Sequence, residues 1–145
     1  MNLLYEQTKA LTENEKDLIA NLSNISACLN ENLDNINWVG FYIMKNNELV
    51  LGPFQGKPAC IRIPVGKGVC GTCVKERKIQ RVEDVHKFPG HIACDGASNS
   101  EIVLPIFKNN DVVAVLDIDS PIFNRFSIED EAKLKEVADY ISNLF

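Results

Sequence analysis

The sequence lacks any apolar run of the roughly 20 residues that a membrane-spanning helix needs. Its first residues, Met-Asn-Leu-Leu-Tyr-Glu-Gln, have neither the basic start nor the apolar core of a signal peptide. An excess of positive charge is also missing, because the formal net charge is -5 with acids and bases interleaved. These absences argue against membrane and nucleic-acid partners. We therefore expect a cytoplasmic protein whose thiols are reduced at rest.

Internal repeats and low-complexity segments are absent as well, and histidine is scarce, with two residues in the chain. The 145 residues, 46% of them hydrophobic, are the usual size and composition of one soluble domain with its own core. We therefore predict a single domain over residues 1–145. The five cysteines are an odd number, which in a reducing compartment favours metal or redox use over a disulfide framework.

Helices are predicted at both ends of the chain. In an N-terminal helical segment, residues 1–34, a short helix from about Leu3 to Leu11 precedes a capping box, Thr12-Glu-Asn-Glu15, that predicts the start of a longer helix. Leucine and isoleucine then recur at three- and four-residue steps from Leu18 to Leu33, with Cys28 beside this stripe as buried filler. Ser127, followed by acids in the first turn, predicts a C-terminal helix over residues 127–145.

The middle of the chain reads as strands separated by turns, among them Lys45-Asn-Asn-Glu48 and a tight turn at Asn109-Asn110. Aromatic and β-branched runs predict strands over Ile36–Met44, Glu48–Phe54, Cys60–Val65, Ile79–Val82, Glu101–Phe107 and Val112–Asp119, with a short helix over Val69–Arg77. The last two strands are apolar on both faces, which places them in the middle of the sheet. We therefore predict an α+β fold, a mostly antiparallel sheet of five to six strands with the terminal helices on one face and a long loop on the other.

That loop, from His86 to Glu101, is where we expect the chemistry. It contains both histidines and Cys94, and a loop of this length in a compact domain is usually functional or disordered. Cys94 lies in Ala-Cys-Asp-Gly, where irregular backbone could point N–H groups at a ligand or a thiolate.

The pair Cys70-Gly-Thr-Cys73 offers a second candidate centre. Cys70 lies at a predicted helix start near Lys67, so we expect a lowered thiol pKa there, whereas Cys73 lies one turn on and is expected to face inward. The strand–helix–strand context of thioredoxin-like proteins is missing. A zinc site is the alternative, and its candidate ligands are Cys70, Cys73, His86, His91 and Cys94, whose spacing does not form a second paired knuckle.

Two further groups are candidates for binding. Asp117 and Asp119 share one face at the end of a strand, and Glu101 begins the strand expected to pair with it. These acids are either a solvated strand end or a site for an ammonium or metal ion, with one acid of raised pKa. Trp38 and Tyr42 also share a face, as ordinary core or as a wall for a methyl or thioether group.

Five segments together resemble one enzyme family. They are Ile63-Pro-Val-Gly-Lys-Gly-Val-Cys-Gly-Thr72, Glu83-Asp-Val-His86, Gly90-His-Ile-Ala-Cys-Asp95, Ser98-Asn-Ser-Glu-Ile-Val-Leu-Pro105 and Val115-Leu-Asp-Ile-Asp-Ser120. The pattern is similar to that of the free methionine-(R)-sulfoxide reductases, small enzymes made of a single GAF domain. Cys60, Cys70 and Cys94 match the family's three cysteines, and Cys28 and Cys73 fall outside them.

The resemblance implies a thiol-dependent oxidoreductase that reduces the R epimer of free methionine sulfoxide and is recycled by thioredoxin. It implies Cys94 as nucleophile, Cys60 as resolving thiol and Cys70 as a second one, although the local sequence alone favours Cys70 as nucleophile. It also places substrate binding on Trp38, Tyr42, Glu101, Asp117 and Asp119, with Glu101 or Asp119 as proton donor.

The resemblance implies no cofactor and no metal. A homodimer is one of the oligomeric states that the sequence leaves open. The alternative function is a non-catalytic GAF domain that binds a small molecule, although a lone domain has no output module to regulate.

Overall fold

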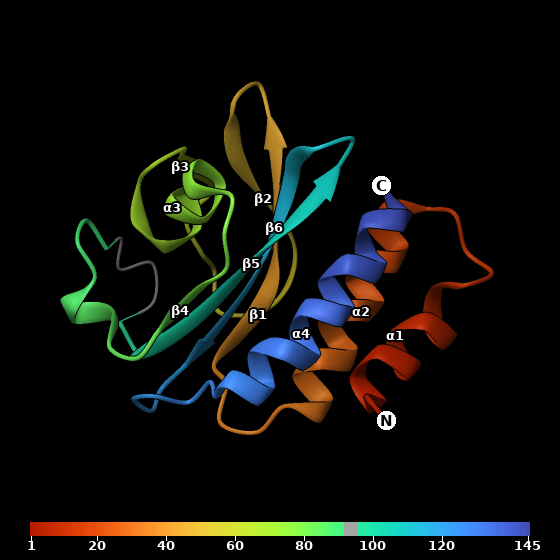
Figure 1. The fold of residues 1–145 in the computed structure, drawn as a ribbon, viewed down its shortest axis with the longest axis horizontal. Coiled ribbons are helices and arrows are strands. Elements are labelled where there is room, and N and C mark those ends of the chain that lie inside the picture. The colour runs from red at the N-terminus through yellow and green to blue at the C-terminus, as the bar shows by residue number, and fades with distance from the viewer. Residues whose placement is uncertain (92–95) are drawn as a thin grey trace.

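One antiparallel sheet, in the strand order β3-β2-β1-β6-β5-β4, organises the computed structural model, which describes residues 1–91 and 96–145 (Figure 1). In this part of the chain the strands are β1 (Trp38–Lys45), β2 (Glu48–Gly56), β3 (Arg62–Pro64), β4 (Gln80–Val82), β5 (Ser100–Lys108) and β6 (Asp111–Ser120). The two strands predicted from their apolar character to be central, β5 and β6, are paired on both sides. The antiparallel α+β prediction is therefore confirmed.

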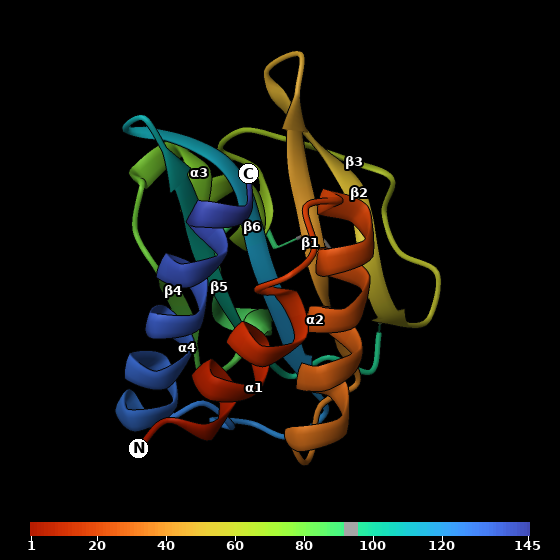
Figure 2. The same cartoon turned by 90° about the vertical axis from the view of Figure 1, so that its right-hand side faces the viewer.

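The helices divide between the two faces of the sheet (Figures 1 and 2). On one face lie α1 (Leu3–Thr12), α2 (Leu18–Asn32) and α4 (Ile128–Ile141), and on the other lies α3 (Gly68–Glu76). Short 3-10 turns follow at η1 (Val85–Lys87), inside the predicted long loop, and at η2 (Ser142–Leu144). The predicted packing of both terminal helices on one face is confirmed. In the described ranges, no helix has the length and apolar character that crossing a membrane requires.

Strand alternation sorts the apolar residues into two clusters. Val39, Phe41 and Leu116 are fully buried against α2 and α4. Their neighbours along the strands point the other way, so Trp38 and Tyr42 pack with Val69 and other residues of α3. The first face is continuous apolar core, and the second combines apolar packing with the polar residues described below.

Of two helix starts predicted from capping residues, one agrees with the structure and the other does not. Ser127 caps α4 as predicted, and it forms a capping box with Asp130. The capping box predicted at Thr12 is wrong, because α2 begins at Leu18 with Asp17 as its cap. The hydroxyl of Thr12 is buried at the end of α1, where it donates to the Thr8 carbonyl and lies 2.9 Å from the Tyr140 hydroxyl.

The turns and short strands show a similar division. Asn46-Asn47 and Asn109-Asn110 have positive φ at both residues, which is the two-residue hairpin geometry, so both predicted turns are confirmed. The strand predicted over Cys60–Val65 is shorter than expected, since β3 covers only Arg62–Pro64. Cys60 therefore lies in the segment of residues 57–61 between β2 and β3, which we call the Cys60 segment.

Gly71 gives a test of how closely α3 approaches the chain that precedes it. A Cβ at this position would lie 2.4 Å from the carbonyl oxygen of Pro64 and 3.1 Å from the backbone nitrogen of Gly66. Gly71→Ala is therefore expected to lower the free energy of unfolding by about 1–3 kcal/mol, the usual range for overpacking. Urea denaturation measures this change. Gly96→Ala is the control, because its Cβ would meet no atom within 4 Å. Equal stabilities of the two variants would contradict the packing described here.

Candidate active site

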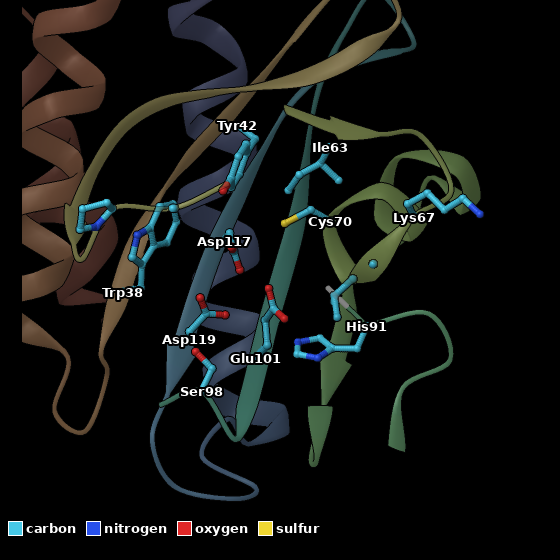
Figure 3. A pocket seen from close by; sticks show the side chains of 14 residues that line it. Trp38, Tyr42, Ile63, Lys67, Cys70, His91, Ser98, Glu101, Asp117 and Asp119 are labelled. Atoms are coloured by element: carbon cyan, nitrogen blue, oxygen red, sulfur yellow. The ribbon is translucent and has the colours of Figure 1, made fainter. Parts of the chain in front are cut away.

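The register of three strands brings the predicted acids together. Asp119 on β6 is opposite Trp38 on β1 and opposite Glu101 on β5. Asp117 lies two residues before Asp119, on the same face of β6. Glu101 is 7% exposed and Asp117 is 5% exposed. Figure 3 shows the three carboxyl groups side by side. We call Glu101, Asp117 and Asp119 the acid cluster. Asp119 is half-buried, and the burial of Glu101 and Asp117 rules out a solvated strand end.

A cavity between the sheet and α3 opens onto the acid cluster (Figure 3). Trp38 and Tyr42 line it from β1, with their rings stacked at 5.8 Å. Cys70 and Ile63 line it from the side of α3 and β3. The prediction that Trp38 and Tyr42 share a face is confirmed. Both residues pack in the core of this face and also line the cavity, so the two interpretations offered for them both apply.

One cavity residue, Ser98, was not singled out from the sequence, and another, His91, was considered only as a zinc ligand. Ser98 is 6% exposed, and its hydroxyl accepts a hydrogen bond from the Asn37 side chain at 3.1 Å. Asn37 in turn donates its backbone N–H to the Asp119 carbonyl, which ties both residues to the end of β6. His91 also lines the cavity, and burial lowers its pKa. Nothing in the local pattern distinguishes Ser98 from other loop serines, so only the fold reveals it.

Burial dominates the electrostatics of the acid cluster. It raises the pKa of Glu101 well above the ordinary value, and the nearby charges of Asp117 and Asp119 raise it further. Burial also raises the pKa of Asp117, although hydrogen bonds from Glu101 and Cys70 oppose that change. Asp117 Oδ1 has no hydrogen-bond partner, and the salt bridges of the described residues do not include Glu101 or Asp117. Burial and mutual repulsion therefore favour the protonated form of Glu101, and a cation bound beside the cluster would favour the carboxylates.

The expected activation of Cys70 is wrong. Burial raises the pKa of its thiol well above the ordinary value, and the acid cluster adds to the effect. Lys67, whose charge was expected to lower that pKa, directs its amine away from the acids (Figure 3). Burial and, after it, the neighbouring carboxylates therefore outweigh the helix dipole at this position.

Known proteins share both the sequence and this fold. Residues 22–145 match the GAF domain family. The free methionine-R-sulfoxide reductase of Escherichia coli is 59% identical over 128 residues, which cover 88% of this chain and 78% of that protein. The chain belongs to the GAF-domain free methionine-R-sulfoxide reductase family.

Solved structures of this family superpose closely on the chain. A structure of fRMsr of Staphylococcus aureus in complex with substrate has a TM-score of 0.93 and 57% identity, and the match covers 98% of this chain and 93% of that one. A free methionine-R-sulfoxide reductase from Neisseria meningitidis in complex with its substrate has a TM-score of 0.95 and 41% identity, with 98% and 86% covered. The family resemblance and the GAF-like fold expected from the sequence are therefore confirmed.

The remaining cysteines of this family member occupy different environments. Cys73 faces inward as predicted, with its thiol donating to the Val103 carbonyl at 3.7 Å, and burial raises its pKa. Cys28 is buried filler, as expected. Cys28, Cys70 and Cys73 are free thiols, and Cys60 is disulfide-bonded. The predicted nucleophile, Cys94, lies in the range 92–95, outside the described residues.

The predicted zinc ligands do not come together in the described part of this reductase-family chain. His86 is largely exposed and lies 2.8 Å from the Asp84 carboxylate, and Cys73 is bonded to the sheet. The group that could hold a metal there is instead Cys70, Glu101 and Asp117, whose donor atoms lie within 4.8 Å of one another. Of the predicted ligands only Cys70 belongs to it. The zinc alternative based on paired cysteines and histidines is therefore not supported.

The buried Glu101 carboxyl predicts how stability depends on pH. The pKa of Glu101 is higher in the folded than in the unfolded chain. Its contribution to the free energy of unfolding is therefore fully present below the pKa of the unfolded chain, and is lost as the pH rises above that pKa. Glu101→Gln keeps the shape of the protonated acid and removes this loss. Its stability relative to wild type is expected to rise with pH by up to about 1.4 kcal/mol per unit.

Urea denaturation of the empty, reduced protein between about pH 5 and pH 8 measures the difference. Glu31→Gln serves as the control, since Glu31 is exposed on α2. Parallel pH profiles for Glu101→Gln and wild type would show that Glu101 is ionised when the cavity is empty.

Proposed function

We propose that this protein reduces free methionine-(R)-sulfoxide to methionine. The observation that carries the proposal is one cavity in which the acid cluster faces the rings of Trp38 and Tyr42, which we call the aromatic wall. The chain that forms this cavity belongs to the reductase family. The Staphylococcus aureus and Neisseria meningitidis structures named above are substrate complexes of such enzymes, which supports transfer of the substrate to this chain.

The acid cluster accounts for a preference for the free amino acid. The ammonium of free methionine sulfoxide supplies a positive charge beside Glu101 and Asp117. Its attraction to their carboxylates offsets the repulsion between the acids. A peptide-bound methionine sulfoxide has a neutral amide in place of the ammonium, and two chain ends that the cavity would have to admit. Trp38 and Tyr42 offer apolar ring faces to the thioether end of the substrate.

The chemistry follows from thiol oxidation. The Cys94 thiolate attacks the sulfoxide sulfur, and Glu101 or Asp119 protonates the oxygen. The hydroxyl then passes to the Cys94 sulfur as the S–O and S–S bonds to the methionine sulfur break, which releases methionine and leaves Cys94 as a sulfenic acid. The Cys60 thiol then attacks the Cys94 sulfur, the S–O bond breaks and water departs, leaving a disulfide. The disulfide-bonded state of Cys60 supports its assignment as resolving thiol.

Cys70 fits a secondary role. Its raised pKa and burial make it a weak nucleophile at neutral pH, although it lines the same cavity. It is therefore a thiol that acts after Cys60 rather than the residue that attacks the sulfoxide. We further propose thioredoxin as the reductant that exchanges with the disulfide, and the cytoplasm as the compartment. A homodimer stays a prediction.

An epimer-resolved assay tests the proposed activity. Reduced protein with dithiothreitol is expected to consume the R epimer of free methionine sulfoxide and to leave the S epimer. Because the ammonium is the recognised charge, the N-acetylated R epimer is expected to react at least about 100-fold more slowly, as for a buried polar site left unpaired. Chromatography of methionine measures each rate. Saturable binding of small ligands without turnover would favour the non-catalytic GAF domain instead.

Single cysteine replacements test the assigned nucleophile. Cys94→Ser is expected to abolish methionine formation even in a single turnover, because burial raises the pKa of Cys70, the thiol that lines the cavity among the described residues. Cys60→Ser is expected to form one equivalent of methionine and then stop when thioredoxin is the only reductant. Cys28→Ser, on α2 and far from the cavity, is the control that keeps wild-type rates. An active Cys94→Ser variant would overturn the assignment of Cys94.

A further inference from the structure

The polar atoms of the aromatic wall are bonded to the Cys60 segment. The Trp38 indole N–H donates to the carbonyl of Lys57 at 3.2 Å. The Tyr42 hydroxyl donates to the carbonyl of Cys60 itself, at 2.9 Å. The two residues whose rings line the cavity therefore hold, by their polar edges, the stretch of chain that carries the resolving thiol.

The Cys60 segment depends on these bonds because it has no secondary structure of its own. Residues 57–61 lie between β2 and β3 and form neither helix nor strand. Besides the bonds from Trp38 and Tyr42, the backbone N–H of Leu51 donates to the Ile61 carbonyl at 2.9 Å. The Cys60 carbonyl is thus held by a side chain, whereas the next carbonyl is held by the sheet.

The anchors are rigid. Trp38 and Tyr42 are each 2% exposed and belong to β1, which is paired on both sides. The Trp38 ring stacks on Tyr42 at 5.8 Å and on Phe54 of β2 at 5.1 Å, with interplanar angles of 22° and 15°. Such packing leaves neither ring free to rotate away from the carbonyl that it bonds.

The Tyr42 hydroxyl is fixed as a hydrogen-bond donor. Burial and the charge of Asp117 raise its pKa well above the ordinary value, so the phenol keeps its proton throughout the neutral range. Its partner is a backbone carbonyl, which accepts only. The bond therefore persists whether the acid cluster is empty or occupied.

We propose that Tyr42, assisted by Trp38, is a positioning residue for the resolving step, in addition to forming the cavity wall. This inference rests on the proposed function. By fixing the Cys60 backbone, the Tyr42 hydroxyl places the Cys60 sulfur where it attacks the Cys94 sulfenic acid as the S–O bond breaks and water leaves. Rates of such intramolecular steps depend steeply on how well the reacting groups are held in place.

Tyr42→Phe separates the two roles, because it removes the hydroxyl and keeps the ring. In a single turnover, reduced protein is mixed with one equivalent of methionine-(R)-sulfoxide. Methionine is measured by chromatography, sulfenic acid by dimedone trapping and disulfide by loss of free thiols. We expect Tyr42→Phe to accumulate dimedone-reactive Cys94 as methionine forms, and to close the disulfide about five- to tenfold more slowly per sulfenic acid formed, the effect of one lost hydrogen bond. Because Tyr42 also lines the cavity, closure is compared only after methionine has formed.

Tyr140→Phe is the matched control. It also removes a tyrosine hydroxyl, one that lies 2.9 Å from the Thr12 hydroxyl on the opposite face of the sheet. Its disulfide closure is expected to match wild type, since that hydroxyl does not touch the Cys60 segment. Trp38→Phe, which removes the bond to Lys57, is the second variant and decides the question if Tyr42→Phe does not fold by circular dichroism.

The outcomes are distinguishable. If Tyr42→Phe forms methionine and then closes the disulfide at the wild-type rate, the inference is overturned and the proposed function is not. The same result in Trp38→Phe decides the question if Tyr42→Phe does not fold. Slower methionine formation without accumulation of the Cys94 sulfenic acid also overturns the inference, because the hydroxyl would then serve the substrate and not the resolving step. An absence of methionine from the wild-type reaction overturns the proposed function and the inference with it.

Discussion

Mutual repulsion within the acid cluster is the constraint on which the site depends. Glu101, Asp117 and Asp119 are placed together by the register of β1, β6 and β5, and the hairpin that joins β5 to β6 does not allow one strand to shift without turning its apolar face outward. Burial in such a position disfavours the charged forms of Glu101 and Asp117. The protein therefore keeps an arrangement that is unfavourable when empty and that a bound ammonium would complete.

The two faces of the sheet have different roles, one in stability and the other in the proposed chemistry. The face covered by α2 and α4 buries a continuous apolar cluster, which supplies the stability that the acid cluster reduces. The face covered by α3 carries the cavity, where Trp38 and Tyr42 take part in packing, in the cavity wall and in holding the Cys60 segment. A single strand, β1, thus connects the proposed substrate site to the proposed resolving thiol.

The sequence predicts what depends on local periodicity. Apolar runs located the central strands, Asn-Asn pairs located both hairpin turns, and strand alternation placed Asp117 and Asp119 on one face. It does not predict what depends on distant partners. The pKa of Cys70 is raised by burial between α3 and the sheet and by acids on β5 and β6, and the hydroxyl of Thr12 is occupied by Thr8 and Tyr140 instead of capping α2. The bond between Tyr42 and the Cys60 carbonyl likewise exists only once the sheet is assembled.

The charge state of Glu101 is the most direct test of this account, and it can be measured by carbon-13 NMR titration of the side-chain carboxyl in the reduced protein. Without ligand, Glu101 is expected to titrate well above the ordinary glutamate pKa. Adding methionine, which has the same ammonium but does not oxidise the thiols, is expected to lower that pKa, because a nearby cation favours the carboxylate. An ordinary pKa in the empty protein, or one that methionine does not change, would contradict the claim that the buried acids receive the ammonium.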